Sequence, residues 1–191
     1  MSRAPLTVAE LDALAAAGLL SEGASTELVA GVLLASASPS AAVLRAVADL
    51  AAALGAAAPD HRVEVRAALV AGPRDLLRPE VSLVRPAWRP ASEAWPRLAG
   101  GRRGAQPAAR WAAAGVALAV FVGEDEAPLR WRAHRCASAG VREVWTIAVG
   151  ERRASRWRAP ADGRYTRRDA LPLGEPVAPD ALPERPVVAW R

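Results

Sequence analysis

The sequence of 191 residues contains no lysine and no asparagine, and it has one cysteine, one tyrosine, one phenylalanine and two histidines. The single cysteine, Cys136, excludes an internal disulfide bond and any zinc site built from several cysteines. With only His61 and His134 as further nitrogen or sulfur ligands, a four-ligand zinc site is not expected. The candidate ligands for a metal ion are therefore carboxylates.

The absence of lysine makes all 25 basic residues arginine, and the chain carries a net charge of +5. Two interpretations of this composition remain open. A coding bias toward arginine and alanine would produce it without any demand from function. Selection for phosphate contacts would also produce it, because the guanidinium group binds phosphate through two parallel hydrogen bonds. The positive charge permits nucleic-acid binding and does not by itself establish it.

Long apolar runs are missing as well. The longest, at residues 112–123, is well short of the roughly 20 residues that a transmembrane helix needs. The first residues soon reach Glu10 and Asp12 and do not resemble a secretory signal peptide. We therefore expect a cytoplasmic protein without membrane contact, folded as a single domain over residues 1–191.

Apolar residues at helical spacing predict three helices. The first covers residues 7–19 and opens on a capping box formed by Thr7 and Glu10. The second runs from the serine–proline segment to about Leu54, over residues 38–54. The third covers residues 128–139 and follows the longest apolar run.

The remaining patterns predict the strands of one mixed sheet flanked by helices, which is an α/β fold. A hairpin with its turn at Ala30 and Gly31 is expected first. The later strands are expected, in chain order, at residues 62–69, at 79–84 after a turn at 72–75, at 116–122, at 141–149, and at the sheet edge at 152–158 and 164–168. The stretch at residues 86–106 is rich in proline, glycine and arginine and predicts a long loop.

Carboxylates at strand ends are the main candidates for chemistry, because no G-x-S-x-G, Walker or G-x-G-x-x-G motif occurs. Glu80 stands at the head of one strand, and Glu124, Asp125 and Glu126 follow the central strand. Two or three carboxylates around Mg²⁺ or Mn²⁺ suit the cleavage of a phosphodiester, because hard cations prefer oxygen ligands. The three adjacent acids could instead stabilise the start of the following helix, whose dipole favours negative charge there.

The order of these segments resembles the Uma-two family of restriction-endonuclease-like proteins, in the PD-(D/E)XK nuclease superfamily. The resemblance extends over nearly the whole chain. It is carried by the hairpin at residues 27–31, the serine–proline element at 38–40, the strand head at 79–82, and the segment 139–145, which resembles the family's glycine-valine-x-glutamate-tyrosine-tryptophan signature. The resemblance implies a restriction-endonuclease-like core, DNA as the partner, Mg²⁺ or Mn²⁺ as the cofactor, and a homodimer.

The resemblance also assigns site residues one by one. Glu27 matches the first acid of the family, and Glu80 stands where the family has aspartate. The strand acid falls on Phe121, which cannot bind a metal ion, and the helix lysine falls on Arg132. Cys136 stands where a tyrosine is usual. Arginine stabilises charge on a phosphate but stays protonated and cannot act as a base, so cleavage by the family mechanism is expected to be weak or lost.

Three functions remain open from the sequence. The first is a divergent DNA endonuclease with little or no cleavage. The second is an active metal-dependent nuclease in which Glu27, Glu80 and one of Glu124, Asp125 and Glu126, with Glu124 as the first candidate, hold the ion. The third is a non-catalytic, arginine-rich module that binds nucleic acid or dimerises, for which Arg130, Arg132 and Arg135 on the third helix are candidate phosphate contacts.

Each candidate residue also has a purely structural interpretation. Glu27 could be a solvated acid of the hairpin, and Glu80 could pair with Arg78 or Arg66 on the sheet surface. The helix arginines could be solvated, with their stems packed along the helix. Cys136, on the inner helix face, could be a small buried apolar residue.

Overall fold

The computed structural model describes residues 5–19, 26–35, 38–88, 110–188 and 190. Within these ranges no helix is long and apolar enough to cross a membrane. The helices and strands are, in chain order, α1 (Val8–Ala16), β1 (Thr26–Val29), β2 (Val32–Ala35), α2 (Ala41–Ala57), β3 (Arg62–Val65), β4 (Ala68–Gly72), β5 (Asp75–Leu77), β6 (Val81–Val84), β7 (Arg110–Ala112), the 3₁₀ turn η2 (Ala113–Gly115), β8 (Val116–Gly123), α3 (Glu126–Ser138), β9 (Glu143–Ala148), β10 (Arg153–Ala161), β11 (Arg164–Ala170), β12 (Pro176–Val177) and β13 (Val187–Val188).

The fold is α/β, as the sequence predicts, but its strands form two main sheets instead of one. One sheet has five strands in the order β2-β1-β5-β4-β7, and the other has six in the order β11-β10-β9-β8-β6-β3. Both sheets are mixed, because β4 pairs with β7 and β8 pairs with β9 in parallel among otherwise antiparallel neighbours. Helix α3 is the crossover between the parallel strands β8 and β9, as a parallel pair requires.

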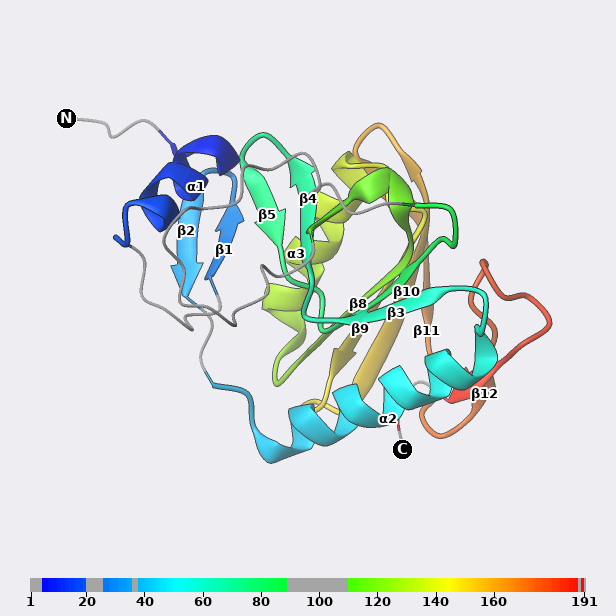
Figure 1. Ribbon diagram of the computed structural model, residues 1–191. Helices are drawn as coiled ribbons and strands as arrows, with labels where there is room; N and C mark the ends of the chain where they lie inside the picture. Colours follow the sequence, from blue (N-terminus) through cyan, green and yellow to red (C-terminus); the bar gives the residue numbers. More distant parts are fainter. Residues whose placement is uncertain (1–4, 20–25, 36–37, 89–109, 189, 191) are drawn as a thin grey trace.

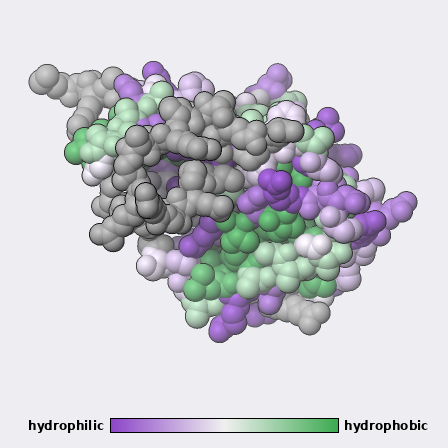
Figure 2. Space-filling view, viewed as in Figure 1, coloured by the Kyte–Doolittle hydropathy of each residue, from purple (hydrophilic) through white to green (hydrophobic). Residues whose placement is uncertain are grey.

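Helices α2 and α3 cover opposite faces of the six-stranded sheet (Figure 1). Successive side chains of a strand point to opposite faces, so neighbours in β8 belong to different apolar clusters. Val120 packs with Leu50 of α2, whereas Phe121 packs with Ala133 and Cys136 of α3. The exposed side of α2 is also rich in apolar residues, among them Leu44, and Figure 2 shows hydrophobic surface over this helix.

Helix α3 also packs against the five-stranded sheet. Val29 of β1 and Leu77 of β5 share an apolar cluster with Leu129 and Ala133 of α3. Helix α1 covers the other face of that sheet, where Leu11 packs against Leu28. Helix α3 therefore lies between the two sheets and packs against both (Figure 1).

Two local predictions are confirmed in detail. Thr7 and Glu10 form the capping box at the start of α1, with the Thr7 amide donating to the Glu10 carboxylate at 2.7 Å. The hairpin of β1 and β2 turns at Ala30 and Gly31, whose φ angles of 51° and 78° are the left-handed values that a two-residue turn needs. Both features could be predicted because the residues that form each of them are close together in the sequence.

The strand predicted at residues 62–69 is wrong. Strand β3 ends at Val65, the chain turns at Arg66 with φ 54°, and β4 begins at Ala68 in the other sheet. Val65, which the alternation assigns to a buried face, has 52% of its surface exposed. Alternation continues through the break because both halves are strands, so the pattern does not reveal that they join different sheets.

Other boundaries also shift. The turn at residues 72–75 leads into the additional strand β5, and the strand predicted at 79–84 begins only at Val81. Helix α3 begins at Glu126 instead of residue 128, and α1 ends at Ala16 instead of residue 19. Strand β10 is not at the sheet edge, because it pairs with both β9 and β11. The predicted long loop falls largely on residues 89–109, outside the described residues.

Candidate functional site

A cleft of about 860 Å³ opens where the two sheets meet the starts of α2 and α3. Its lining includes three arginines and four acids, of which Glu27 lies in β1, Arg132 lies in α3 and the others lie in the connections between elements. The residues that matter most for its chemistry are Glu27, Arg66, Arg78, Glu80, Val122 and Arg132. The fold thus brings Glu27, Glu80 and Arg132, which the sequence analysis selected together, to one cavity.

Glu27 lies inside the protein, with 1% of its surface exposed, and both of its carboxylate oxygens are bonded. Its Oε1 accepts the backbone N–H of Arg78 at 2.7 Å. Its Oε2 accepts Nε of Arg132 at 2.8 Å and lies 2.7 Å from Nη2 of the same side chain. Glu27 is therefore the buried partner of Arg132, and its interpretation as a solvated hairpin acid is wrong.

Glu80 joins the start of β6 to the end of β8. Its Oε2 accepts the backbone N–H of Val122 at 3.0 Å. Burial raises the pKa of Glu80 to about 7, against the Val122 hydrogen bond and the charge of Arg132, which both lower it. Near neutral pH this carboxyl group is therefore about half protonated. It forms no ion pair with Arg66 or Arg78 within the described residues.

The other two arginines of the cleft differ in how they are held. Arg78 donates from Nε to the carbonyl oxygen of Thr26 at 3.1 Å, and burial lowers the pKa of its guanidinium. Arg66 has the left-handed backbone of φ 54°, and its side chain makes no hydrogen bond or ion pair with the described residues. From the sequence alone, Arg66 and Arg78 are expected only as partners of Glu80. The one signal for Arg66 is its position between β3 and β4, where the alternating run divides.

The acids after β8 separate into two groups. Glu124 and Asp125 are exposed and line the mouth of the cleft. Glu126 lies in the first turn of α3 and pairs with Arg153 and Arg168, away from the cleft. Asp125 holds the N-cap position, but its side chain makes no capping hydrogen bond. Of these three acids, Glu124 and Asp125 therefore line the cleft, whereas Glu126 is the one in the first turn of α3.

No group of three or more histidine, cysteine, aspartate or glutamate side chains is arranged to hold a metal ion in the part of the chain that the structure describes. Phe121, which stands at the family's acid position, is fully buried between β8 and α3. Cys136 is fully buried in the same cluster, and burial raises the pKa of its thiol. Neither residue offers a ligand or a nucleophile to the cleft.

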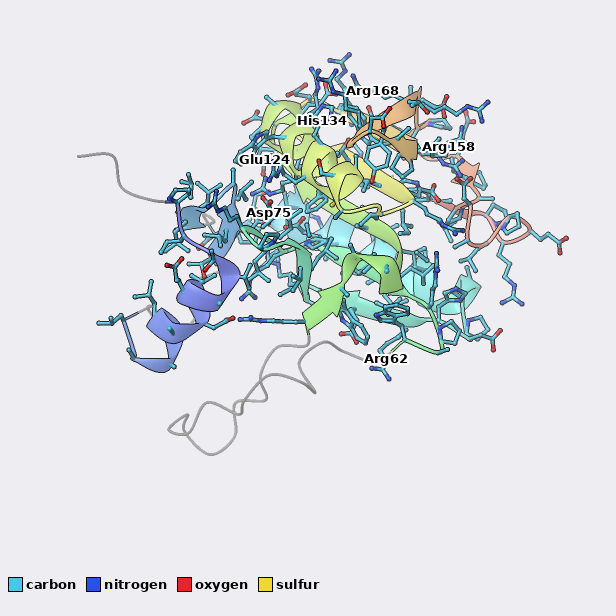
Figure 3. All side chains as sticks on the ribbon, turned by 90° about the horizontal axis from the view of Figure 1, so that it is seen from above. Arg62, Asp75, Glu124, His134, Arg158 and Arg168 are labelled. Carbon is cyan, nitrogen blue, oxygen red and sulfur yellow. The ribbon has the colours of Figure 1, made fainter. Side chains whose placement is uncertain are left out.

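The three candidate phosphate contacts on α3 do not form one surface. Arg130 is exposed. Arg132 binds Glu27, and Arg135 binds Asp75, with its Nε 2.8 Å from Oδ1. Asp75 lies beside α3 in Figure 3. Two of the three arginines therefore attach α3 to the five-stranded sheet instead of facing solvent.

No family model matches the sequence, and no curated protein matches it. Among solved structures, the fold is similar to that of a protein from Anabaena variabilis described as a putative nuclease belonging to DUF820, with a TM-score of 0.66 and 12% sequence identity. The match covers 94% of this chain and 92% of the other. At this identity the likeness concerns the fold alone, and it confirms the prediction of a nuclease-like α/β fold.

Proposed function

We propose that this chain is a divergent DNA endonuclease of the Uma-two type, whose cleft receives a phosphodiester backbone and cleaves it weakly or not at all. The nuclease-like fold and the meeting of Glu27, Glu80 and Arg132 at one cleft support the first half of the proposal. The bonding of Glu27 carries the second half. Its two oxygens, which would be needed for a metal ion, are already bonded to Arg78 and Arg132.

The donor set of the cleft does not fit a tightly held Mg²⁺ or Mn²⁺. These cations prefer several ionised oxygen ligands with free lone pairs. Glu80 is about half protonated near neutral pH and has one oxygen on the Val122 amide. Phe121 supplies no ligand, and Glu124 is exposed at the mouth. In this proposal Glu80 and Glu124 would bind a divalent cation weakly.

Arg132 also lacks the chemistry of the lysine whose place it takes in the resemblance. A guanidinium stays protonated and cannot accept the proton of an attacking water molecule. Its charge is directed toward Glu27 at 2.7 Å. The residue can therefore stabilise negative charge near the cleft but cannot activate a nucleophile.

The alternative of a non-catalytic, arginine-rich module has weaker support. Arg132 and Arg135 are paired with buried acids, and Arg130 alone of the three is exposed. Binding through the outer face of α3 would therefore depend on Arg130. A homodimer, which the resemblance implies, stays a prediction.

The direct test is relaxation of supercoiled plasmid by the purified protein with Mg²⁺, Mn²⁺ or EDTA, beside the variant Glu80→Ala. We expect no metal-dependent relaxation, or slow relaxation that Glu80→Ala removes. Rapid metal-dependent cleavage that needs Glu80 would contradict the impaired site. DNA binding is measured in parallel by fluorescence anisotropy of a labelled duplex at low salt, and absence of binding would contradict the proposal as a whole.

A further inference from the structure

We infer that the cleft is a phosphate-binding site that works without a metal ion, in which Arg132 neutralises the buried Glu27 and Arg66 binds the phosphate group. This inference deepens the proposed function, since the phosphate is taken to belong to a DNA backbone. It assigns a role to Arg66, which neither the resemblance nor the sequence patterns single out.

The balance of charge in the cleft interior favours an anion. Three arginines, Arg66, Arg78 and Arg132, line it against the two inner acids Glu27 and Glu80. Glu27 is bonded to Arg132, so Arg66 and Arg78 face a single further inner acid, Glu80. The interior is therefore net positive. The remaining acids lie exposed at the mouth, where solvent and salt screen them.

The start of α2 adds a second source of positive potential. Residues Ser40 and Val43, at the first turn of this 17-residue helix, line the cleft. The first turn of α2 contains no acidic residue, so nothing on the helix itself neutralises the positive end of its dipole. An anion in the cleft would thus face both arginines and a helix N-terminus.

Arg66 is the residue with the best reason to contact the ligand. Its φ of 54° is a left-handed value, shared with Ala30, Arg152, Ala159 and Asp162, that turns the chain between β3 and β4. Here the Arg66 amide donates to the carbonyl oxygen of Glu80 at 3.1 Å, which fixes the turn beside the cleft. Its side chain makes no hydrogen bond or ion pair with the described residues, so its guanidinium fork remains available for a phosphate.

A second cavity is also lined by arginines, but most of these arginines already have partners in the protein. It measures about 380 Å³ and is lined by Arg152, Arg153 and Arg168. Glu126 pairs with both Arg153 and Arg168, and the Arg152 guanidinium lies 5.9 Å from the centre of the Trp190 ring. Two of these three cations therefore share one acid, although the side chain of Arg153 is 66% exposed. The cleft at Arg66 is the better anion site.

The experiment measures binding of a fluorescein-labelled DNA duplex by the full chain in EDTA and in Mg²⁺, with inorganic phosphate as competitor. The variants are Arg66→Gln and the matched control Arg142→Gln, which also removes one charge, at an exposed position that has no partner in the described residues. We expect equal affinity in EDTA and Mg²⁺, a loss of about tenfold in Arg66→Gln, and a change below about twofold in the control.

The variant Arg66→Gly separates binding from folding. Glycine adopts positive φ without strain, so this variant should unfold at a higher temperature than the wild type and still lose affinity for the duplex. A structural role for Arg66 would instead make stability and affinity fall together. That result would overturn the inference.

The remaining outcomes distinguish the inference from the proposed function. Binding that requires Mg²⁺ would overturn the metal-free site and leave a metal-dependent nuclease possible. Equal losses in Arg66→Gln and Arg142→Gln would place the DNA on the general surface and overturn the cleft site. If the duplex does not bind but phosphate raises the melting temperature of the wild type and not of Arg66→Gln, the anion site stands and the DNA proposal falls.

Discussion

Glu27 and Arg132 form the strongest single interaction of the cleft. The side chain of Glu27 is 2% exposed and that of Arg132 is 21% exposed, so the pair lies largely out of water. Removing one partner of a buried ion pair leaves an uncompensated charge, which typically costs about 3–5 kcal/mol. Arg132 therefore stabilises the folded chain as well as setting the charge of the cleft. A substitution at Arg132 cannot be interpreted through activity alone.

Glu80 should make the stability of the protein depend on pH. Its folded pKa of about 7 lies above the ordinary glutamate value, so the folded state binds a proton more tightly than the unfolded state. Its ionisation therefore costs no stability below the unfolded pKa. The cost grows as the pH rises through the interval between the two pKa values and is complete above about 7.

We expect Glu80→Gln to raise the free energy of unfolding at pH 8 by on the order of 2 kcal/mol, because glutamine stays neutral and can still accept the Val122 amide. Near pH 4.5 the two proteins should be about equally stable. Chemical denaturation at both pH values measures the difference. The matched control is Glu175→Gln at an exposed position, which should change little. A larger advantage at the lower pH would contradict the raised pKa.

At the scale of the elements, α3 joins the two sheets through ions as well as through apolar packing. Asp75, at the start of β5, accepts Nε of Arg135 and also the backbone N–H of Ala30 in the β1–β2 turn, each at 2.8 Å. One carboxylate thus holds together α3, β5 and the hairpin that carries Glu27. The position of Glu27 in the cleft depends on this link.

We expect Asp75→Ala to destabilise the protein by about 2 kcal/mol, because both donors lose their acceptor in a partly buried place. Asp75→Asn should cost roughly 1 kcal/mol, because its amide oxygen can still accept the Ala30 amide while the ion pair is lost. Hydrogen exchange of residues 26–35 measures the effect on the hairpin. If Asp75→Asn loosened the hairpin as much as Asp75→Ala, the ion pair and not the Ala30 hydrogen bond would hold it.

At the scale of the whole molecule, many arginines are paired with carboxylates, several of them at the surface. Arginines of β10 and β11 pair with carboxylates from α3, β9, β11 and the chain after β12: Arg153 and Arg168 with Glu126, Arg156 with Glu143 and Asp180, and Arg158 with Asp169. Arg158 and Arg168 lie at the end of the molecule away from α1 (Figure 3). The net charge of +5 is thus not a measure of the charge available to a ligand.

The salt dependence of DNA binding should show how many arginines contact phosphate groups. If the three arginines of the cleft are the cations that meet phosphates, log K should fall with log salt concentration with a slope of roughly −3. Participation of the arginines of β10 and β11 would make the slope much steeper. Anisotropy titrations between about 50 and 200 mM salt measure it. A slope near zero would exclude phosphate contacts altogether.

The resemblance grouped Glu27, Glu80 and Arg132, which line one cleft, but it could not show how they contact each other. The first acid and the helix arginine are 105 residues apart, and the Arg78 amide is 51 residues from Glu27. Periodicity reports which face a residue occupies on its own element and carries no information about partners at such distances. The ion pair that occupies both oxygens of Glu27 could therefore not be predicted.

The sequence by itself determined the α/β class, the three helices, the hairpin turn and the loss of the acid and lysine that the resemblance requires. These features depend on short-range spacing and on residue identity. Only the tertiary structure decided that the alternating run divides at Arg66 between two sheets, and that Arg132 and Arg135 turn inward to Glu27 and Asp75. The reason is physical: each of these outcomes depends on which distant elements pack together, and burial then makes the pairing of opposite charges obligatory.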